Sequence, residues 1–81
     1  MIPKDESLTR GKNYRVVYRI PGEKPRRMVA TLLGLNKEAY LFSGRPDFGT
    51  TPVQRKYVRS LTRTSERPQA PRTISEVRKN G

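Results

Sequence analysis

Hydrophobic and polar residues alternate in the first strongly patterned stretch of the chain. Between residues 14 and 20 the even positions carry only tyrosine, valine and isoleucine, whereas Arg15 and Arg19 occupy two of the three odd positions. A period of two residues is typical of a β-strand that buries one face. The pattern therefore predicts a half-buried strand over residues 14–20, with Arg15 and Arg19 on its outward side.

Three further runs predict strands of the same kind. Residues 26–35 are apolar on both parities and end near Gly34, where a bulge or sharp bend is expected. Residues 39–43 form the third run, and residues 53–54 open a fourth. The dipeptide Pro21-Gly22 lies between the first two runs and favours a turn.

The segment after residue 53 has two interpretations. The favoured one is a tight turn at residues 55–57 followed by a fifth strand at 58–62. The alternative is a short helix over residues 54–61, with Tyr57, Val58 and Leu61 on one side. This helix lacks a strong N-cap and length, which favours the strand.

These elements predict an all-β fold, either a small five-stranded SH3-like barrel or a strongly curved antiparallel sheet, with disordered termini. Over residues 12–63 the order of strand, turn, long bent strand, strand, single turn and strand resembles the SH3-like and Sm-like barrels. The expected organisation is a flexible arm at 1–12, a barrel at 13–63 and a disordered basic tail at 64–81. The resemblance implies a fold, and such barrels bind nucleic acid, peptides and other subunits alike.

Charge adds a functional expectation. The 81 residues include 18 Lys and Arg but only seven Asp and Glu, which gives a net charge of +11. Residues 10–61 hold twelve of the bases and three of the acids, so the excess lies mainly in the expected barrel. Arg outnumbers Lys, and its planar guanidinium suits phosphate groups. A polyanion is therefore the expected partner.

Missing residue types argue against several other functions. Without histidine or cysteine the chain lacks the commonest general base, the strongest nucleophile and the usual zinc ligands. We therefore expect no enzyme activity, no cofactor, no metal and no small-molecule substrate. The absence of cysteine favours the cytoplasm, and no apolar run approaches the length of a membrane span. No amphipathic basic helix is predicted either, so a membrane partner is not expected.

Ten residues are candidates for nucleic-acid contact. If the first and last strands pair, then Arg15, Arg19, Arg59 and Arg63 form one basic stripe, unless their charges only protect strand edges. The full candidate set is Arg15, Arg19, Arg26, Arg27, Arg45, Phe48, Arg55, Lys56, Arg59 and Arg63.

The aromatic residues divide into two groups. Tyr14, Tyr18, Tyr40 and Phe42 lie at strand positions and are expected in the core or at its rim. Phe48 lies in a Gly- and Pro-flanked loop, where its ring either stacks on an exposed base or closes one end of the barrel.

Two functions remain in competition. The first is a small nucleic-acid-binding accessory protein that contacts DNA or RNA mainly through backbone phosphates, with weak sequence preference. The second is an SH3-like interaction or assembly module, such as a phage-encoded adaptor or regulator, that docks on an acidic protein. A continuous basic stripe favours the first, and an exposed apolar patch from Val17, Val29 and Leu33 favours the second. Under either hypothesis, the protein is expected to be a monomer or a small homo-oligomer.

Overall fold

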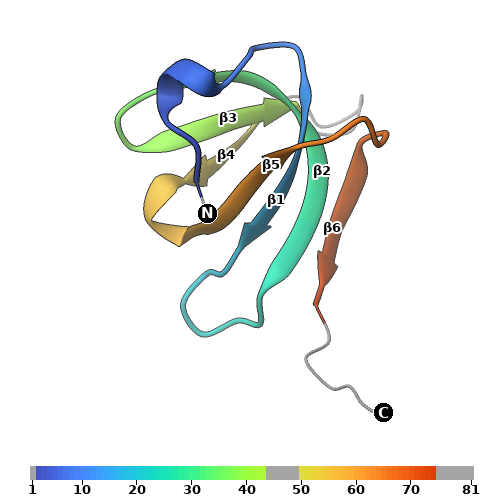
Figure 1. Ribbon diagram of the computed structural model, residues 1–81. Helices are drawn as coiled ribbons and strands as arrows, with labels where there is room; N and C mark the ends of the chain where they lie inside the picture. The colour runs from blue at the N-terminus through green and yellow to red at the C-terminus, as the bar shows by residue number, and fades with distance from the viewer. Residues whose placement is uncertain (1, 44–49, 75–81) are drawn as a thin grey trace.

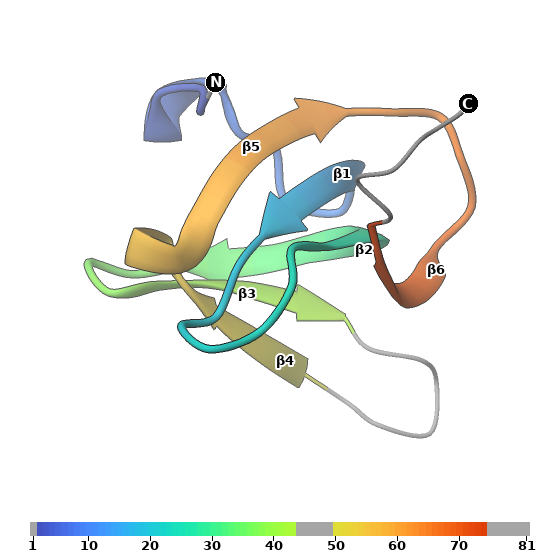
Figure 2. The same cartoon turned by 90° about the horizontal axis from the view of Figure 1, so that it is seen from below.

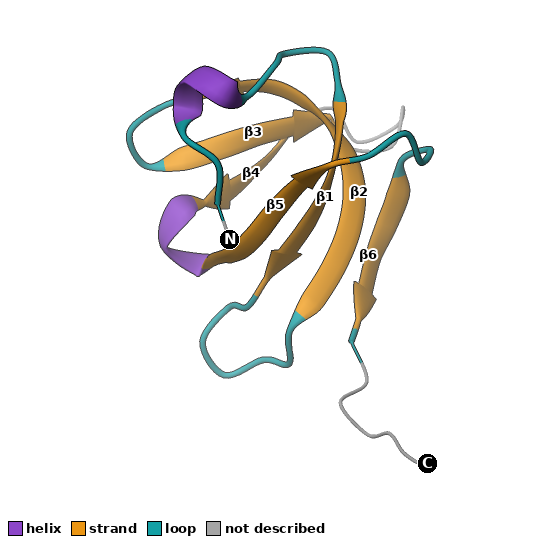
Figure 3. Ribbon diagram, viewed as in Figure 1, coloured by secondary structure: helices purple, strands orange, loops and turns teal. Residues whose placement is uncertain are grey.

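In the part of the chain that it describes, the computed structural model contains six antiparallel strands and two single-turn 3-10 helices (Figure 1, Figure 3). The structure describes residues 2–43 and 50–74. In chain order the elements are η1 (Asp5–Ser7), β1 (Asn13–Tyr18), β2 (Arg26–Leu35), β3 (Ala39–Ser43), β4 (Thr50–Gln54), η2 (Arg55–Tyr57), β5 (Val58–Arg63) and β6 (Gln69–Thr73).

The strands form one strongly curved sheet in the order β4-β3-β2-β1-β5, and β6 pairs with β2 off this path. Figure 2 shows β1 and β5 on one side, β3 and β4 on the other, and β2 running between them. This arrangement confirms the predicted all-β class and curved antiparallel sheet. It contains a sixth strand that the sequence pattern did not predict.

A bulge in β2 allows one strand to serve both halves of the sheet. Leu32 is opposite Phe42 of β3, but the next pair is Gly34 and Leu41, which leaves Leu33 as an extra residue. An extra residue in one strand bends that strand and increases its twist. The bend predicted near Gly34 is therefore confirmed.

The core lies inside the curve of the sheet. Its largest fully buried side chains are Tyr14, Val16, Leu32, Phe42 and Leu61, which come from β1, β2, β3 and β5. The four aromatic residues that the pattern places in the core, Tyr14, Tyr18, Tyr40 and Phe42, are all buried.

The turn after β1 explains why this strand ends earlier than predicted. Glu23 N–H donates to the Ile20 carbonyl over 2.9 Å, and Gly22 between them has φ +85°. Pro21 at the second position and a positive φ at the third define a type II turn. Strand β1 stops at Tyr18, so Ile20 is 36% exposed instead of buried.

The segment after β4 is a single 3-10 turn at Arg55–Tyr57 and then strand β5, as favoured from the sequence. The alternative helix over residues 54–61 is wrong. Val58 and Leu61 are both buried although they are three residues apart in a strand. Val58 pairs with Tyr18 and Leu61 pairs with Val16 of β1, and a β-bulge lies between the two pairs. The extra residue in β5 allows both side chains to face the core.

Residues outside the predicted barrel also make ordered contacts. On the N-terminal side Leu8 packs against the core, and Thr9 N–H donates to the Tyr14 hydroxyl over 2.9 Å. On the C-terminal side β6 pairs with β2 over Arg26–Val29, on an edge that β3 leaves free because it pairs only from Leu32 onward. Backbone hydrogen bonds need no apolar side chain, which is why the polar composition of this segment did not predict a strand.

Met1 and residues 44–49 and 75–81 lie outside the described residues. Within the described part of the chain, no helix is long and apolar enough to cross a membrane.

Candidate nucleic-acid interface

The side of β1 and β2 that faces away from the core, here called the outer face, carries a group of arginines. In β1 the buried residues alternate with Asn13, Arg15 and Val17, which therefore project outward. Directly opposite residues on paired strands share a face. One outward row runs from Val17 through Arg27 to Arg72, and the neighbouring row runs from Arg15 through Val29 to Gln69.

Arg27 and Arg72 lie directly opposite each other on β2 and β6. Both are exposed. Within residues 2–43 and 50–74, neither of them takes part in an ion pair or a side-chain hydrogen bond. Like charges in directly opposite positions destabilise a strand pair. The pair therefore costs stability unless an anion lies between the two guanidinium groups.

Arg15 does have an acidic partner. Its Nε and Nη2 donate to Glu66 Oε1 over 3.3 and 2.8 Å. The hydrogen bond from Arg15 is the main cause that lowers the pKa of Glu66, and the charge of Arg27 lowers this pKa further. Glu66 is thus an anion held within the electrostatic reach of two outer-face arginines.

Glu66 reaches this position because residues 64–68, here called the crossover segment, connect β5 to β6 across β1 and β2. Asn13 Nδ2 donates to the Glu66 carbonyl over 3.0 Å, so the segment passes over the outward side of β1. Figure 2 shows this connection leaving β5 and turning back to β6.

Val29 is a buried residue of the outer face. Val29 is only 3% exposed but does not belong to the core cluster, which contains its neighbours Met28 and Ala30. Its side chain therefore points outward.

The predicted stripe of four arginines does not form, although β1 and β5 do pair. Arg15 is opposite Thr62, whereas Arg63 is opposite the buried Tyr14 and so belongs to the other face. Arg59 is the extra residue of the bulge, between the pairs Val17 with Ser60 and Tyr18 with Val58.

Arg19 follows the end of β1 and belongs to the turn. Its Nε donates to the Glu23 carbonyl over 3.1 Å. Arg63 instead lines an open depression of about 430 Å³ together with Lys12, Thr64 and Ser65. Neither arginine lies in the two rows of the outer face.

Arg55 is a structural residue. Its two Nη atoms donate to the carboxylate of Asp5 over 2.9 Å each, and its Nε donates to the Asn36 carbonyl over 2.8 Å. The guanidinium also lies over the Tyr40 ring at 4.7 Å from the centroid. These contacts use the donors that a phosphate would need, and they attach the N-terminal segment to the sheet.

Two other candidates occupy separate places, and two are not described. Lys56 lies over the Tyr57 ring at 5.3 Å, and Arg26 forms an ion pair of 2.8 Å with Glu23 at the β1–β2 turn. Arg45 and Phe48 lie outside the described residues, so neither interpretation of Phe48 is tested.

The apolar patch that would favour a protein partner is not continuous. Leu33 is 45% exposed, but Val17 is half-buried and Val29 is covered. Arg15 and Arg27 lie beside the two valines in the same rows.

Glu66 and Asn13 are the site residues that the sequence did not indicate, whereas Arg72 was indicated only as one of several basic residues of the tail that could contact phosphates. Arg15 and Glu66 are 51 positions apart, and no local pattern connects them. The only sequence signal for Arg72 was the general positive charge of the tail.

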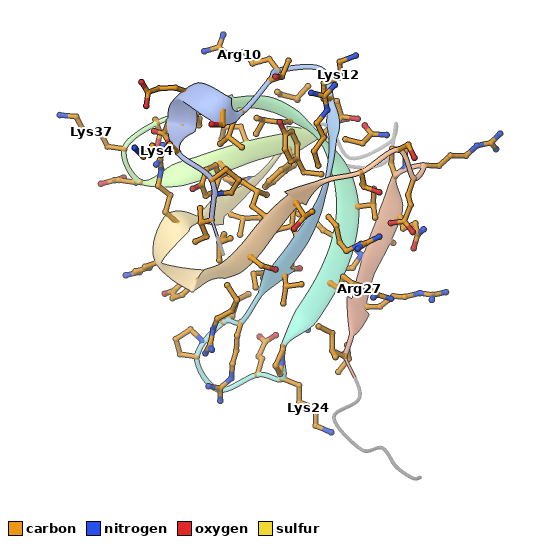
Figure 4. The ribbon with its side chains drawn as sticks, in the orientation of Figure 1. Lys4, Arg10, Lys12, Lys24, Arg27 and Lys37 are labelled. Atoms are coloured by element: carbon orange, nitrogen blue, oxygen red, sulfur yellow. The ribbon has the colours of Figure 1, made fainter. Side chains whose placement is uncertain are left out.

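Exposed cations extend well beyond the outer face. Besides Arg27 of the outer face, Figure 4 labels five exposed cations from other parts of the chain: Lys4, Arg10, Lys12, Lys24 and Lys37. Among the described residues, no group of three or more Asp, Glu, His or Cys side chains is placed to hold a metal ion. Comparisons with protein-family models, curated proteins and solved structures gave no match.

Proposed function

We propose that this protein binds nucleic acid as an accessory factor, mainly through backbone phosphates and with weak sequence preference. The observation that most directly supports this proposal is the surplus of exposed cations without acidic partners. In residues 2–43 and 50–74 the ion pairs are Arg15–Glu66, Arg26–Glu23 and Arg55–Asp5, which leave most basic side chains unpaired. Such a surface repels itself and attracts polyanions.

The proposed scaffold is an SH3-like barrel. The strand order β4-β3-β2-β1-β5 and the single 3-10 turn before β5 support it. Because barrels of this shape serve several functions, the fold does not select a partner. Charge favours nucleic acid, and the patch of Val17, Val29 and Leu33 that would favour a protein partner is not continuous.

Binding of this kind is driven by the release of counterions. Each phosphate that a Lys or Arg neutralises frees condensed cations into solution, so affinity falls as salt rises. Contacts to phosphates position a protein but carry no sequence information. Weak sequence preference follows from the same mechanism.

Titration with labelled single- and double-stranded DNA and RNA at two salt concentrations tests the proposal. If roughly four to six phosphates are neutralised, the logarithm of affinity falls against the logarithm of salt concentration with a slope of about −3.5 to −5.5 on duplex DNA. No binding to any probe at low salt refutes the function. Binding without salt dependence refutes the mechanism.

A further inference from the structure

The crossover segment places a carboxylate where a phosphate would be bound. Glu66 accepts two hydrogen bonds from Arg15 and lies within the electrostatic influence of Arg27. A guanidinium binds carboxylate and phosphate oxygens with the same planar donor geometry. Glu66 therefore marks a position on the outer face that already holds an anionic oxygen.

The arginines around this position are close enough to act together. Arg27 and Arg72 are direct partners, so their Cα atoms lie about 4.5–5.5 Å apart. Arg15 is a diagonal neighbour of Arg27 on the adjacent strand, at about 7–8 Å. One carboxylate serves this group of three cations, so two of them lack an acidic partner among the described residues.

Glu66 is also easy to displace. The side chains of Arg15 and Glu66 are 41% and 43% exposed, and an exposed ion pair contributes little to stability. The remaining Glu66 contacts involve its own backbone carbonyl and the hydroxyl of Thr64 two residues away. The carboxylate can therefore leave Arg15 while Asn13 keeps the crossover segment in place.

From these observations, and resting on the proposed function, we infer that Arg15, Arg27 and Arg72 form a phosphodiester-binding site in which Glu66 is an internal competitor. A nucleic-acid phosphate replaces the Glu66 carboxylate on Arg15 and neutralises the Arg27–Arg72 pair. Glu66 thereby lowers the affinity of the free protein for nucleic acid.

Two matched pairs of variants test this site with labelled DNA and RNA, single- and double-stranded, at about 0.15 M salt. Glu66→Gln is compared with Glu38→Gln, which removes the same charge from the β2–β3 turn. Arg27→Gln is compared with Lys37→Gln, which removes one exposed cation from that turn. Thermal melting and the far-ultraviolet spectrum establish that each variant is folded.

One phosphate contact contributes about fivefold to affinity at this salt concentration. We expect Glu66→Gln to tighten binding by about fivefold and Arg27→Gln to weaken it by about fivefold. In Arg27→Gln the slope of log affinity against log salt concentration on duplex DNA should also be smaller in magnitude by about 0.9. The affinities of the two control variants, Glu38→Gln and Lys37→Gln, should stay within about twofold of the wild-type affinity.

The outcomes separate the two proposals. If the wild type binds nucleic acid but each variant has the same affinity as its matched control, the outer-face site is refuted and the proposed function stands. If the wild type binds no probe at low salt, both are refuted. A folded Glu66→Gln variant that binds more weakly than the wild type also refutes the role of Glu66 as a competitor.

Discussion

Replacing Arg27 and Arg72 together by glutamine should weaken binding to nucleic acid and leave stability unchanged or slightly higher. Both residues are exposed and directly opposite each other on β2 and β6. The double change removes two phosphate contacts, which lowers the salt slope by about 1.8 on duplex DNA. At about 0.15 M salt this corresponds to a loss of roughly 30-fold in affinity.

The same double change removes a repulsion between like charges. Opposite pairs contribute a fraction of a kcal/mol, and solvent screens this pair because it is exposed. Stability should therefore stay constant or rise by up to about 0.5 kcal/mol. Glutamine keeps part of the aliphatic stem, so the packing beside β6 is largely retained.

Fluorescence anisotropy with labelled duplex measures the affinity, and urea denaturation measures the free energy of unfolding. Lys4→Gln with Lys37→Gln is the matched control, because it removes the same charge from exposed positions elsewhere (Figure 4). An equal loss of affinity in the control would show that only net charge matters. A stability loss above about 1 kcal/mol would show that the two arginines hold β6 in place.

Three further outcomes follow from the structure. Arg55→Ala should release the N-terminal segment from the sheet, which faster amide hydrogen exchange at Thr9 would report; unchanged exchange would contradict the structural role of Arg55. Gly22→Ala should destabilise the fold by about 1–2 kcal/mol in urea denaturation, because φ is +85° in its turn; unchanged stability would contradict the type II turn. The pKa of Glu66 is lowered by Arg15, so its contribution to stability is present above the ordinary carboxyl pKa of about 4 and is lost as the pH falls through the lowered value. The melting temperature should therefore fall less steeply between pH 7 and pH 3 in Glu66→Gln than in the wild type. Parallel curves of melting temperature against pH would contradict this linkage.

Local patterns were sufficient to predict most of the strands. The alternation from residue 14 and the turn chemistry of Pro21-Gly22 each act over a few residues, so both can be read from the sequence. Register is different, because a one-residue shift moves every side chain to the opposite face. The bulge at Arg59 made the predicted stripe of arginines wrong for this reason.

That bulge did leave a signal in the sequence. Val58 and Leu61 have opposite parity, and both can face the core only if β5 contains an extra residue. The same spacing suggested the alternative helix. The contact between Arg15 and Glu66 left no such signal, since it depends on where a polar segment crosses the finished sheet.

Strand β6 has all five side chains exposed and borders a sheet whose core it does not enter. It pairs with β2 over Arg26–Val29, on the edge of β2 opposite β1. Elements with few buried apolar contacts open locally at a much smaller free-energy cost than global unfolding. In hydrogen-exchange terms β6 and the crossover segment should be less protected than β1, β2, β3 and β5, so the outer face opens and closes many times within the lifetime of one folded molecule.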